Sequence, residues 1–259
     1  MNTLRRTKIV VTLGPALDDK DILQRVILAG ADVFRANFSH GSVETHEQRI
    51  HSVRALAEKH GKTVAILADL QGPKIRIGRF KNKKIQLQEN QSFILDTDLG
   101  DDEGTEETVS LDYKDLPKDV FPGDMLLLDD GRIVMQVKKI EKNRIHCIVI
   151  VSGELSNNKG INRQGGGLSA EALTDKDRSD IKEAVRLRAD YLAISFPRNA
   201  DDVKEARTLL KAAGGTAGII AKIERAEAIT NIEEIIKAAD GVMVARGDLG
   251  VELGDAELP

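Results

Sequence analysis

The sequence of 259 residues predicts an α/β fold in which parallel strands alternate with helices, interrupted by an inserted module of antiparallel strands. Two observations support this prediction. Short, nearly continuous apolar runs alternate with helical patterns towards both ends of the chain, as expected for parallel strands covered by helices. From about Arg76 to Gly167 this rhythm stops, and short strands follow one another across polar turns. The alternation is typical of a doubly wound sheet and of a barrel.

Six strands that alternate with helices are expected. They cover residues 7–14, 33–38, 64–70, 191–196, 218–224 and 241–246. Apolar residues at helical spacing predict helices over 18–29, around 50–60, from Thr174 and from about Ala200. One further helix is expected because a set of apolar residues shares a face: Ala228, Ile232, Ile235, Ile236 and Ala239.

The inserted segment is interpreted as an antiparallel β module. Its candidate strands are KIQLQ, SFILD, MLLLDDGRIVMQVKKI and RIHCIVIV. Asp130-Gly131 is a hairpin signal inside the third of these runs. The acidic stretch from Asp98 to Glu107 is expected to form a solvated surface loop. GGGLS at 165–169 has the backbone freedom of a hinge, so the module is expected to move as a lid.

The composition excludes several classes of protein. A net charge of −4, a pI of about 5.8 and 3% aromatic residues leave neither a basic field nor a stacking surface for nucleic acid. No apolar run has the length of a signal peptide or a membrane span, so a cytoplasmic protein without a membrane partner is expected. The single cysteine, Cys147, excludes an intramolecular disulfide and is expected to be a core thiol.

Polar residues gather where the predicted parallel strands end, which in a barrel is the end that holds the chemistry. They are Arg35, Asn37, Ser39, His40, Asp69, Ser195, Arg198, Lys222, Glu224, Arg246, Gly247 and Asp248. A single one of them is readily explained as a residue of a solvated loop. That explanation fails for the whole set, because polar residues recur at strand after strand.

Lys222 and Glu224 are two residues apart and therefore point to the same side of an otherwise apolar strand. Such charges must be compensated or functional, and a buried structural salt bridge is the alternative interpretation. Together with Asp248, the carboxylate would suit a hard cation such as Mg²⁺, whereas no cluster of His and Cys suggests zinc. Gly247 would let a ligand approach backbone N–H groups closely, although the usual glycine-rich phosphate loops are absent.

Seven segments resemble the pyruvate kinase family in order and spacing. They are TKIVVTLGPA, FRANFSHGS, LADLQGPKIR, LSNNKGIN, AISFPR, AKIERAEA and MVARGDLGVELG, and the resemblance covers essentially the whole chain. It implies a (β/α)8 TIM barrel, incomplete here with about six strands, and an inserted antiparallel β-barrel lid. The implied barrel domain covers 1–71 and 168–259, and the implied lid covers 72–167.

The resemblance implies a glycolytic phosphotransferase that passes the phosphoryl group of phosphoenolpyruvate to ADP and gives pyruvate and ATP. Lys222 matches the lysine that contacts the transferring group, and Arg35 matches the phosphate-binding arginine. Glu224 and Asp248 match the two ligands of a Mg²⁺ or Mn²⁺ ion. The remaining substrate contacts are implied at Arg246, Gly247 and Asp248.

Further positions match the nucleotide side of the family's site. Arg76, which is also implied in catalysis, and Lys159 match nucleotide- or phosphate-contacting residues, and Asn37 is implied in nucleotide binding. Pro15 and His40 match positions near the adenosine. For His40, an ordinary place at the entry of a helix is a reasonable alternative interpretation.

Asn37, Ser39, Asp69 and the Leu70 carbonyl match the family's monovalent-cation site. Members that require potassium read DTKGPEIRTG there, whereas this sequence reads ADLQGPKIRIG and has Lys74 in place of the glutamate. This is similar to the bacterial potassium-independent subgroup, in which a lysine ammonium would replace the ion. We therefore expect no requirement for K⁺.

Family members continue for roughly as much again and form homotetramers. The last barrel strands and a C-terminal regulatory domain are thus expected to be absent here, which predicts raw sheet edges and poor stability or association. Activity of this chain alone therefore stays open. A barrel lyase or aldolase acting on phosphoenolpyruvate or pyruvate is one alternative, against which the lid with LSNNKGIN argues. A catalytically silent structural or binding fragment is the other.

Overall fold

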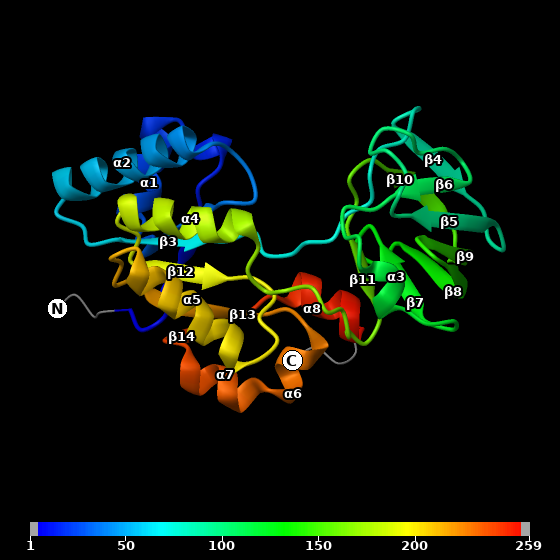
Figure 1. Cartoon of the computed structure of the whole chain (residues 1–259). Helices are drawn as coiled ribbons and strands as arrows, with labels where there is room; N and C mark the ends of the chain where they lie inside the picture. Colours follow the sequence, from blue (N-terminus) through cyan, green and yellow to red (C-terminus); the bar gives the residue numbers. More distant parts are fainter. Residues whose placement is uncertain (1–4, 255–259) are drawn as a thin grey trace. The chain divides into compact units, whose positions relative to one another are not determined.

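The computed structural model describes residues 5–254; residues 1–4 and 255–259, which include Leu258 and Pro259 at the chain's end, lie outside the described part. The chain divides into two compact units (Figure 1). The first joins Met1–Gly72, Ala172–Lys222 and Asn231–Met243, and the second joins Pro73–Glu171, Ile223–Thr230 and Val244–Pro259. Each unit is described by itself below.

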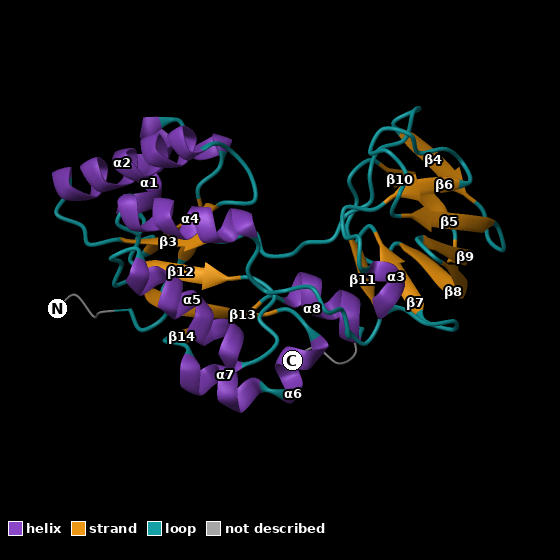
Figure 2. Cartoon of the chain, in the orientation of Figure 1, coloured by secondary structure: helices purple, strands orange, loops and turns teal. Residues whose placement is uncertain are grey.

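A sheet of six parallel strands organises the first unit (Figure 2), and all six strands expected from the sequence are present. The strands are β1 (Val10–Thr12), β2 (Val33–Asn37), β3 (Ala65–Asp69), β12 (Tyr191–Ile194), β13 (Gly218–Ile223) and β14 (Gly241–Val244). Their order in the sheet is their order along the chain. A doubly wound sheet would reverse its order at a switch point, so the topology is that of an α/β barrel.

The register of the sheet aligns the ends of neighbouring strands. Asn37 at the end of β2 lies opposite Asp69 at the end of β3. β3 in turn pairs with β12, with Leu67 opposite Tyr191, although the whole β-rich segment separates the two strands in sequence. Residues that close consecutive strands are therefore brought to one edge of the sheet.

The main helices of the first unit begin at polar N-cap residues whose side chains accept hydrogen bonds from backbone N–H groups. α1 (Lys20–Leu28) follows Asp19, α2 (Val43–Lys59) follows Ser42, α4 (Asp175–Arg186) follows Thr174 and α5 (Ala200–Ala212) follows Asn199. A short 3-10 helix, η1 (Pro15–Leu17), follows β1. Each α-helix then buries one apolar stripe; in α2 it consists of Ile50, Val53 and Ala57.

The prediction of a single helix around residues 228–239 is wrong. The structure has two short helices, α6 (Ala226–Thr230) and α7 (Ile232–Ala238), separated at Asn231. Ile236, expected on the buried face, is 52% exposed. The break has a local reason, because Asn favours caps and turns over helix interiors. The Asn231 side chain donates a hydrogen bond to the Arg198 carbonyl at 2.9 Å, which holds it out of a continuous helix.

The β-rich part of the second unit contains two sheets. The strands are β4 (Lys84–Leu87), β5 (Ser92–Asp96), β6 (Thr108–Ser110), β7 (Met125–Leu128), β8 (Ile133–Glu141), β9 (Arg144–Val151), β10 (Gly153–Ser156) and β11 (Ile161–Arg163). β4 pairs with β10, and the other six form one sheet in the order β11-β7-β8-β9-β5-β6. Their inner faces share one buried apolar core that includes Phe93, Leu95 and Met135. The unit also contains α3 (Leu116–Asp119), α6 and α8 (Arg246–Leu253).

Pairing between the described strands of this segment is antiparallel, as expected, with the exception of one strand pair; an isolated bridge between Phe80 and Gly104 is also parallel. The predicted hairpin at Asp130-Gly131 is confirmed, since it joins the antiparallel strands β7 and β8. β5 and β6, in contrast, pair in parallel. A parallel pair needs a connection long enough to carry the chain back, and the acidic stretch from Asp98 to Glu107 provides it. Most residues of that stretch are exposed, as predicted for a solvated loop.

Cys147 lies inside β9 and is free and buried. Burial raises the pKa of its thiol to about 12, because the charged thiolate is disfavoured away from water. The prediction of a core thiol is confirmed, and Cys147 has none of the features of a reactive cysteine.

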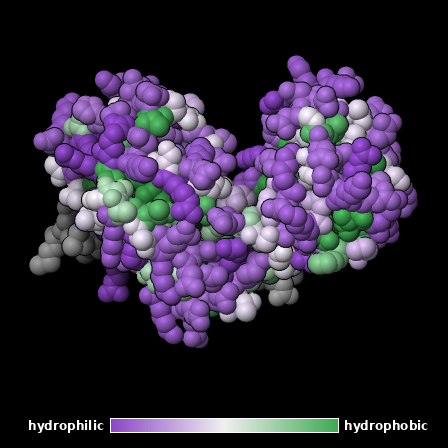
Figure 3. Space-filling view, in the orientation of Figure 1, coloured by the Kyte–Doolittle hydropathy of each residue, from purple (hydrophilic) through white to green (hydrophobic). Residues whose placement is uncertain are grey.

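Hydrophilic residues dominate the face of the molecule in Figure 3, and the apolar residues on it form separate patches. Several of the exposed apolar side chains lie on β1 and β14, the edge strands of the parallel sheet: Val10, Val242 and Val244. Within residues 5–254, no helix combines the length and the apolar character that crossing a membrane would require.

Candidate functional site

The first unit brings together three charged residues predicted from the sequence. Arg35 Nε donates to Asp69 Oδ2 at 2.5 Å, and Lys222 Nζ lies 3.3 Å from Asp69 Oδ1. The Asp69 carboxylate is fully buried, and Lys222 is 11% exposed. Two cations thus share the Asp69 carboxylate. Arginine and lysine side chains at the ends of parallel strands are suited to binding an anion.

Strand pairing explains why these side chains meet. Arg35 lies opposite Leu67, two residues before Asp69, so the side chains of Arg35 and Asp69 leave the same face of the sheet. Thr12 lies opposite Arg35 on the other side, and its Oγ1 accepts from Arg35 Nη1 at 3.0 Å. The guanidinium is thus fixed from both neighbouring strands. Thr12 was not identified as a site residue, since its contact follows only from the register.

Ser195 connects Lys222 to the end of β3. Lys222 Nζ donates to Ser195 Oγ at 2.8 Å, and the Ser195 hydroxyl donates to the Leu70 carbonyl at 2.7 Å. The sequence places Ser195 at the end of a predicted strand but predicts no role for it. Lys222 also forms an ion pair, as the alternative interpretation requires, and Asp69 is one of its partners.

The residues after β2 form a tight turn. Asn37 Oδ1 accepts from the Ser39 N–H at 3.1 Å, and the His40 N–H donates to the Asn37 carbonyl at 3.3 Å. The His40 side chain is exposed. Pro15 lies in the first turn of η1, where its fixed φ suits a helix start. Asn37 and Asp69, two of the expected cation ligands, are direct neighbours across the sheet.

Gly72 allows the chain after β3 to pass close to Ser195. It has a φ of +67°, and a Cβ added there would lie 2.8 Å from Ser195 Cβ and 3.0 Å from the Ser195 carbonyl oxygen. Its N–H donates to the buried carboxylate of Asp177 at 3.0 Å. Phe196 also has a positive φ, +58°, which is unusual for a residue with a side chain. Ser195 is therefore constrained by the close contact of Gly72 and by the unusual backbone conformation of the next residue, Phe196.

Gly72→Ala is expected to lower the free energy of unfolding by about 2–4 kcal/mol, since it combines a left-handed φ with a steric overlap. Gly61→Ala is the matched control, because Gly61 has a φ of +59° and no atom within 4 Å of an added Cβ. The control is expected to lose only about 1 kcal/mol. Urea unfolding of both variants measures the difference, and equal losses would contradict the role of close contact at Gly72.

The second unit contains the other predicted residues. The Ala245 N–H donates to the Ile223 carbonyl at 3.1 Å, which joins the segment before Glu224 to the start of α8. The Glu224 side chain is buried. Asp248 lies in the first turn of α8, and its Oδ1 is 3.2 Å from Lys74 Nζ.

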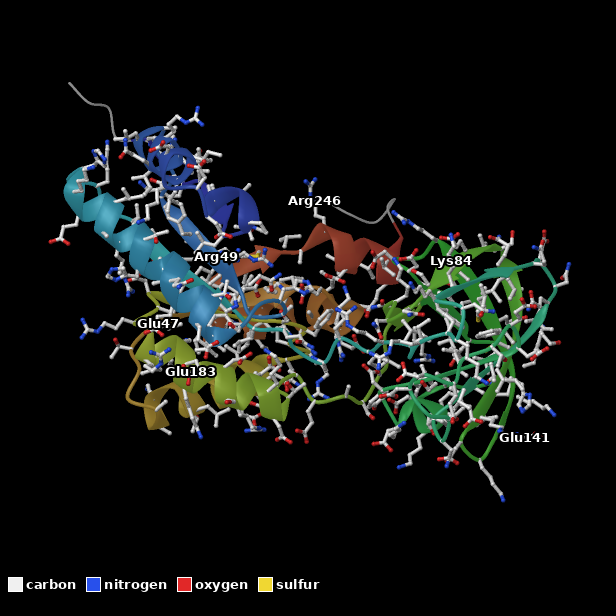
Figure 4. The ribbon with its side chains drawn as sticks, turned by 90° about the horizontal axis from the view of Figure 1, so that it is seen from above. Glu47, Arg49, Lys84, Glu141, Glu183 and Arg246 are labelled. Atoms are coloured by element: carbon white, nitrogen blue, oxygen red, sulfur yellow. The ribbon has the colours of Figure 1, made fainter. Side chains whose placement is uncertain are left out.

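A cavity of 570 Å³ opens at the N-terminus of α8, and its walls include Lys74, Arg246, Gly247 and Asp248. Ala245 is the N-cap and has no side-chain acceptor for the first N–H groups of the helix. At Gly247, an added Cβ would meet no atom within 4 Å. The Arg246 side chain is exposed and points away from α8 (Figure 4). The helix thus presents backbone donors and its positive dipole end to open space.

Arg76 and Lys159 lie on neighbouring segments of the same unit. Arg76 pairs with Gly160 in an isolated antiparallel bridge, and the Ile77 N–H donates to the Lys159 carbonyl at 2.9 Å. Arg76 Nη1 donates to the Asn158 carbonyl at 3.0 Å, and Lys159 Nζ lies 2.7 Å from Asp129 Oδ1. The two residues, which were predicted from separate motifs, therefore lie on neighbouring segments, while their side chains contact different partners.

The family model described as pyruvate kinase, barrel domain, matches residues 4–259. The chain belongs to the pyruvate kinase family. It is 57% identical over 258 residues to pyruvate kinase II of Salmonella typhimurium and 56% identical over 258 residues to pyruvate kinase of Haemophilus influenzae. Each alignment covers 98% of this chain and 54% of the relative. The pyruvate kinase of Corynebacterium glutamicum is 46% identical over 255 residues, or 98% of this chain and 53% of that protein.

This result confirms the family resemblance inferred from the sequence motifs. The chain spans about half the length of the curated pyruvate kinases that it matches. The match to a barrel domain agrees with the parallel sheet, whose strands follow one another in chain order.

Proposed function

We propose that this chain provides phosphate- and phosphoenolpyruvate-binding residues of a pyruvate kinase, and that the whole protein transfers the phosphoryl group to ADP, giving pyruvate and ATP. The observation that carries the proposal is the cluster of two cations around one buried carboxylate, Arg35, Asp69 and Lys222. The arginine and lysine donors of this cluster suit a phosphorylated substrate. The names of the relatives supply the specific reaction.

Arg35 and Lys222 have complementary roles in this proposal. The planar guanidinium of Arg35 donates two parallel hydrogen bonds to two phosphoryl oxygens. A lysine ammonium does not offer this bidentate geometry. When a terminal oxygen of ADP attacks phosphorus, the bond from phosphorus to the bridging oxygen of phosphoenolpyruvate breaks and leaves an enolate. The ammonium of Lys222 stabilises the negative charge that develops on this oxygen. Asp69 and Thr12 hold Arg35 in place.

Glu224 and Asp248 are the proposed ligands of Mg²⁺ or Mn²⁺. Both offer carboxylate oxygens, which these hard cations prefer, and Mg²⁺ commonly takes only one or two protein carboxylates. In residues 5–254 no group of three or more His, Cys, Asp or Glu is placed to hold a metal, which is compatible with such a sparse ligand set. A bound divalent ion would neutralise charge on substrate oxygens.

The start of α8 is the proposed binding site of the substrate carboxylate. Its first N–H groups lack a side-chain cap, and the helix dipole favours an anion there. The fold itself does not explain the glycine at 247, since neither a positive φ nor crowding requires it. Close approach of a ligand to the backbone does explain it. Arg246, Gly247 and Asp248 would then contact the substrate from one helical turn.

The nucleotide is proposed to contact Arg76 and Lys159 through its phosphates, and Pro15, His40 and Asn37 on its adenosine side. Arg76 and Lys159 lie on neighbouring segments of the same unit, and both carry the positive charge that a phosphate attracts. Residues 72–167 are proposed as the lid over a barrel formed by 1–71 and 168–259, with Gly165–Gly167 as its hinge. All three of these glycines have a positive φ, which is a conformation suited to glycine.

We propose further that no K⁺ is required and that the fixed positive charge of Lys74 replaces the ion. The Lys74 ammonium lies 3.2 Å from Asp248 Oδ1, a proposed ligand of the divalent ion. The Leu70 carbonyl, one of the expected ligands besides Asn37, Ser39 and Asp69, already accepts the Ser195 hydroxyl.

Purified chain is expected to release pyruvate from phosphoenolpyruvate in the presence of ADP and Mg²⁺. Lys222→Met is expected to lower this rate roughly 100–1000-fold, the usual cost of removing one group that stabilises a developing anion. Lys182→Met, an exposed lysine of α4, is the control and should keep the wild-type rate. Pyruvate release that needs no ADP would favour the lyase alternative, and an equal rate in Lys222→Met would rule out the proposed role.

The same assay with and without K⁺ tests the cation proposal. The wild-type rate should be independent of K⁺, since Lys74 supplies a permanent positive charge. Lys74→Glu should make the rate rise with K⁺ concentration, because the variant has lost that charge. A steep K⁺ dependence of the wild type would overturn the proposal.

Gly247→Ala should keep the stability of the chain or raise it by up to about 1 kcal/mol, as alanine is the better helix former. Its affinity for phosphoenolpyruvate should fall at least about 10-fold, because a methyl group then fills space needed by the carboxylate. Calorimetric titration and urea unfolding measure the two quantities. Unchanged affinity would argue against substrate binding at the start of α8.

A further inference from the structure

We propose that Ser195 is a positioning residue for Lys222, fixing the direction in which the lysine ammonium faces the substrate. The inference rests on the proposed function for the identity of that substrate, but the placement of Lys222 can be tested without it. Ser195 Oγ lies 2.8 Å from Lys222 Nζ, and the residue is 1% exposed.

The direction of each hydrogen bond in this chain follows from the chemistry of the groups. A carbonyl oxygen only accepts, so the single proton of the Ser195 hydroxyl is donated to the Leu70 carbonyl at 2.7 Å. The serine oxygen then presents lone pairs, and a lysine ammonium can only donate. In the hydrogen bond between the two residues, Lys222 is therefore the donor and Ser195 is the acceptor.

Asp69 alone cannot fix the ammonium in the same way. Its Oδ1 lies 3.3 Å from Lys222 Nζ but has no hydrogen bond, and its Oδ2 is occupied by Arg35. Asp69 therefore attracts Lys222 by charge, while Ser195 supplies a directional bond. Direction matters here because a lysine side chain is long and flexible.

The serine can perform this task because its own position is constrained. The Leu70 N–H donates to the Ala193 carbonyl at 3.0 Å, which ties the end of β3 to the strand that leads to Ser195. Gly72 packs against the serine from the other side, where even an added Cβ would overlap. A constrained acceptor of this kind holds a flexible donor at low entropic cost at the moment of reaction.

Lys222 placement is tested by competitive acetylation of the purified chain at one pH, with the modification rate of each lysine followed by peptide mass spectrometry. Lys222 is expected to be acetylated several times faster in Ser195→Ala than in the wild type. In Ser195→Cys its acetylation rate should be intermediate, since a thiol is a weak acceptor. Ser110→Ala is the matched control. Ser110 is also a fully buried serine, but its hydroxyl has no hydrogen-bond partner.

Kinetics supply the second readout. In Ser195→Ala, kcat is expected to fall about 10–100-fold, as for a displaced catalytic group, while the KM for phosphoenolpyruvate changes little. Ser110→Ala should match the wild type. Faster acetylation in a chain that has no phosphotransferase activity would support the placement of Lys222 and contradict phosphoryl transfer by this chain on its own. Unchanged acetylation of Lys222, or an active chain whose kcat falls no further in Ser195→Ala than in the control, would overturn the inference.

Discussion

The buried carboxylate of Asp69 is the interaction on which the charged cluster of the first unit depends. An ionised carboxylate without exposure to water is costly, and it is tolerated only when cations and hydrogen bonds compensate it. Arg35 and Lys222 provide that compensation from the two sides. Because both cations need the same anion, β2, β3 and β13 must end in the correct register for the charges to balance. The arrangement that stabilises the fold therefore also places the arginine and the lysine that the proposed phosphorylated substrate requires.

Much of this architecture could be predicted from the sequence. The six parallel strands were visible because buried parallel strands are nearly continuous apolar runs, and their lengths were short enough to separate them from helices. The short strands β6, β10 and β11 were missed, since three or four residues carry too little periodicity to be recognised. The break at Asn231 was missed for another reason. A single asparagine is a weak signal for a break inside a helical apolar pattern, and its contact with the Arg198 carbonyl is not visible in the sequence.

The candidate site, like the fold, could be predicted from the sequence only in part. The rule that chemistry lies at the carboxyl ends of barrel strands identified Arg35, Asp69 and Lys222 without any coordinates. The role of Ser195 and the contribution of Thr12 could not be predicted, because both arise from lateral contacts between strands. Ligand approach at Gly247 stays a prediction, and the structure adds that the local backbone gives no other reason for a glycine there.

The pairing of β3 with β12 also bears on how the chain folds. The first three strands can associate as soon as they are made, but the fourth arrives only after the whole β-rich segment. Closing so long a connection is slow when it is a disordered coil, since loop entropy must be overcome before the contact is gained. The segment has an apolar core of its own, and its early collapse would replace the coil by a compact body. Completion of the parallel sheet then becomes the late event of folding, and the charged cluster around Asp69 is assembled last.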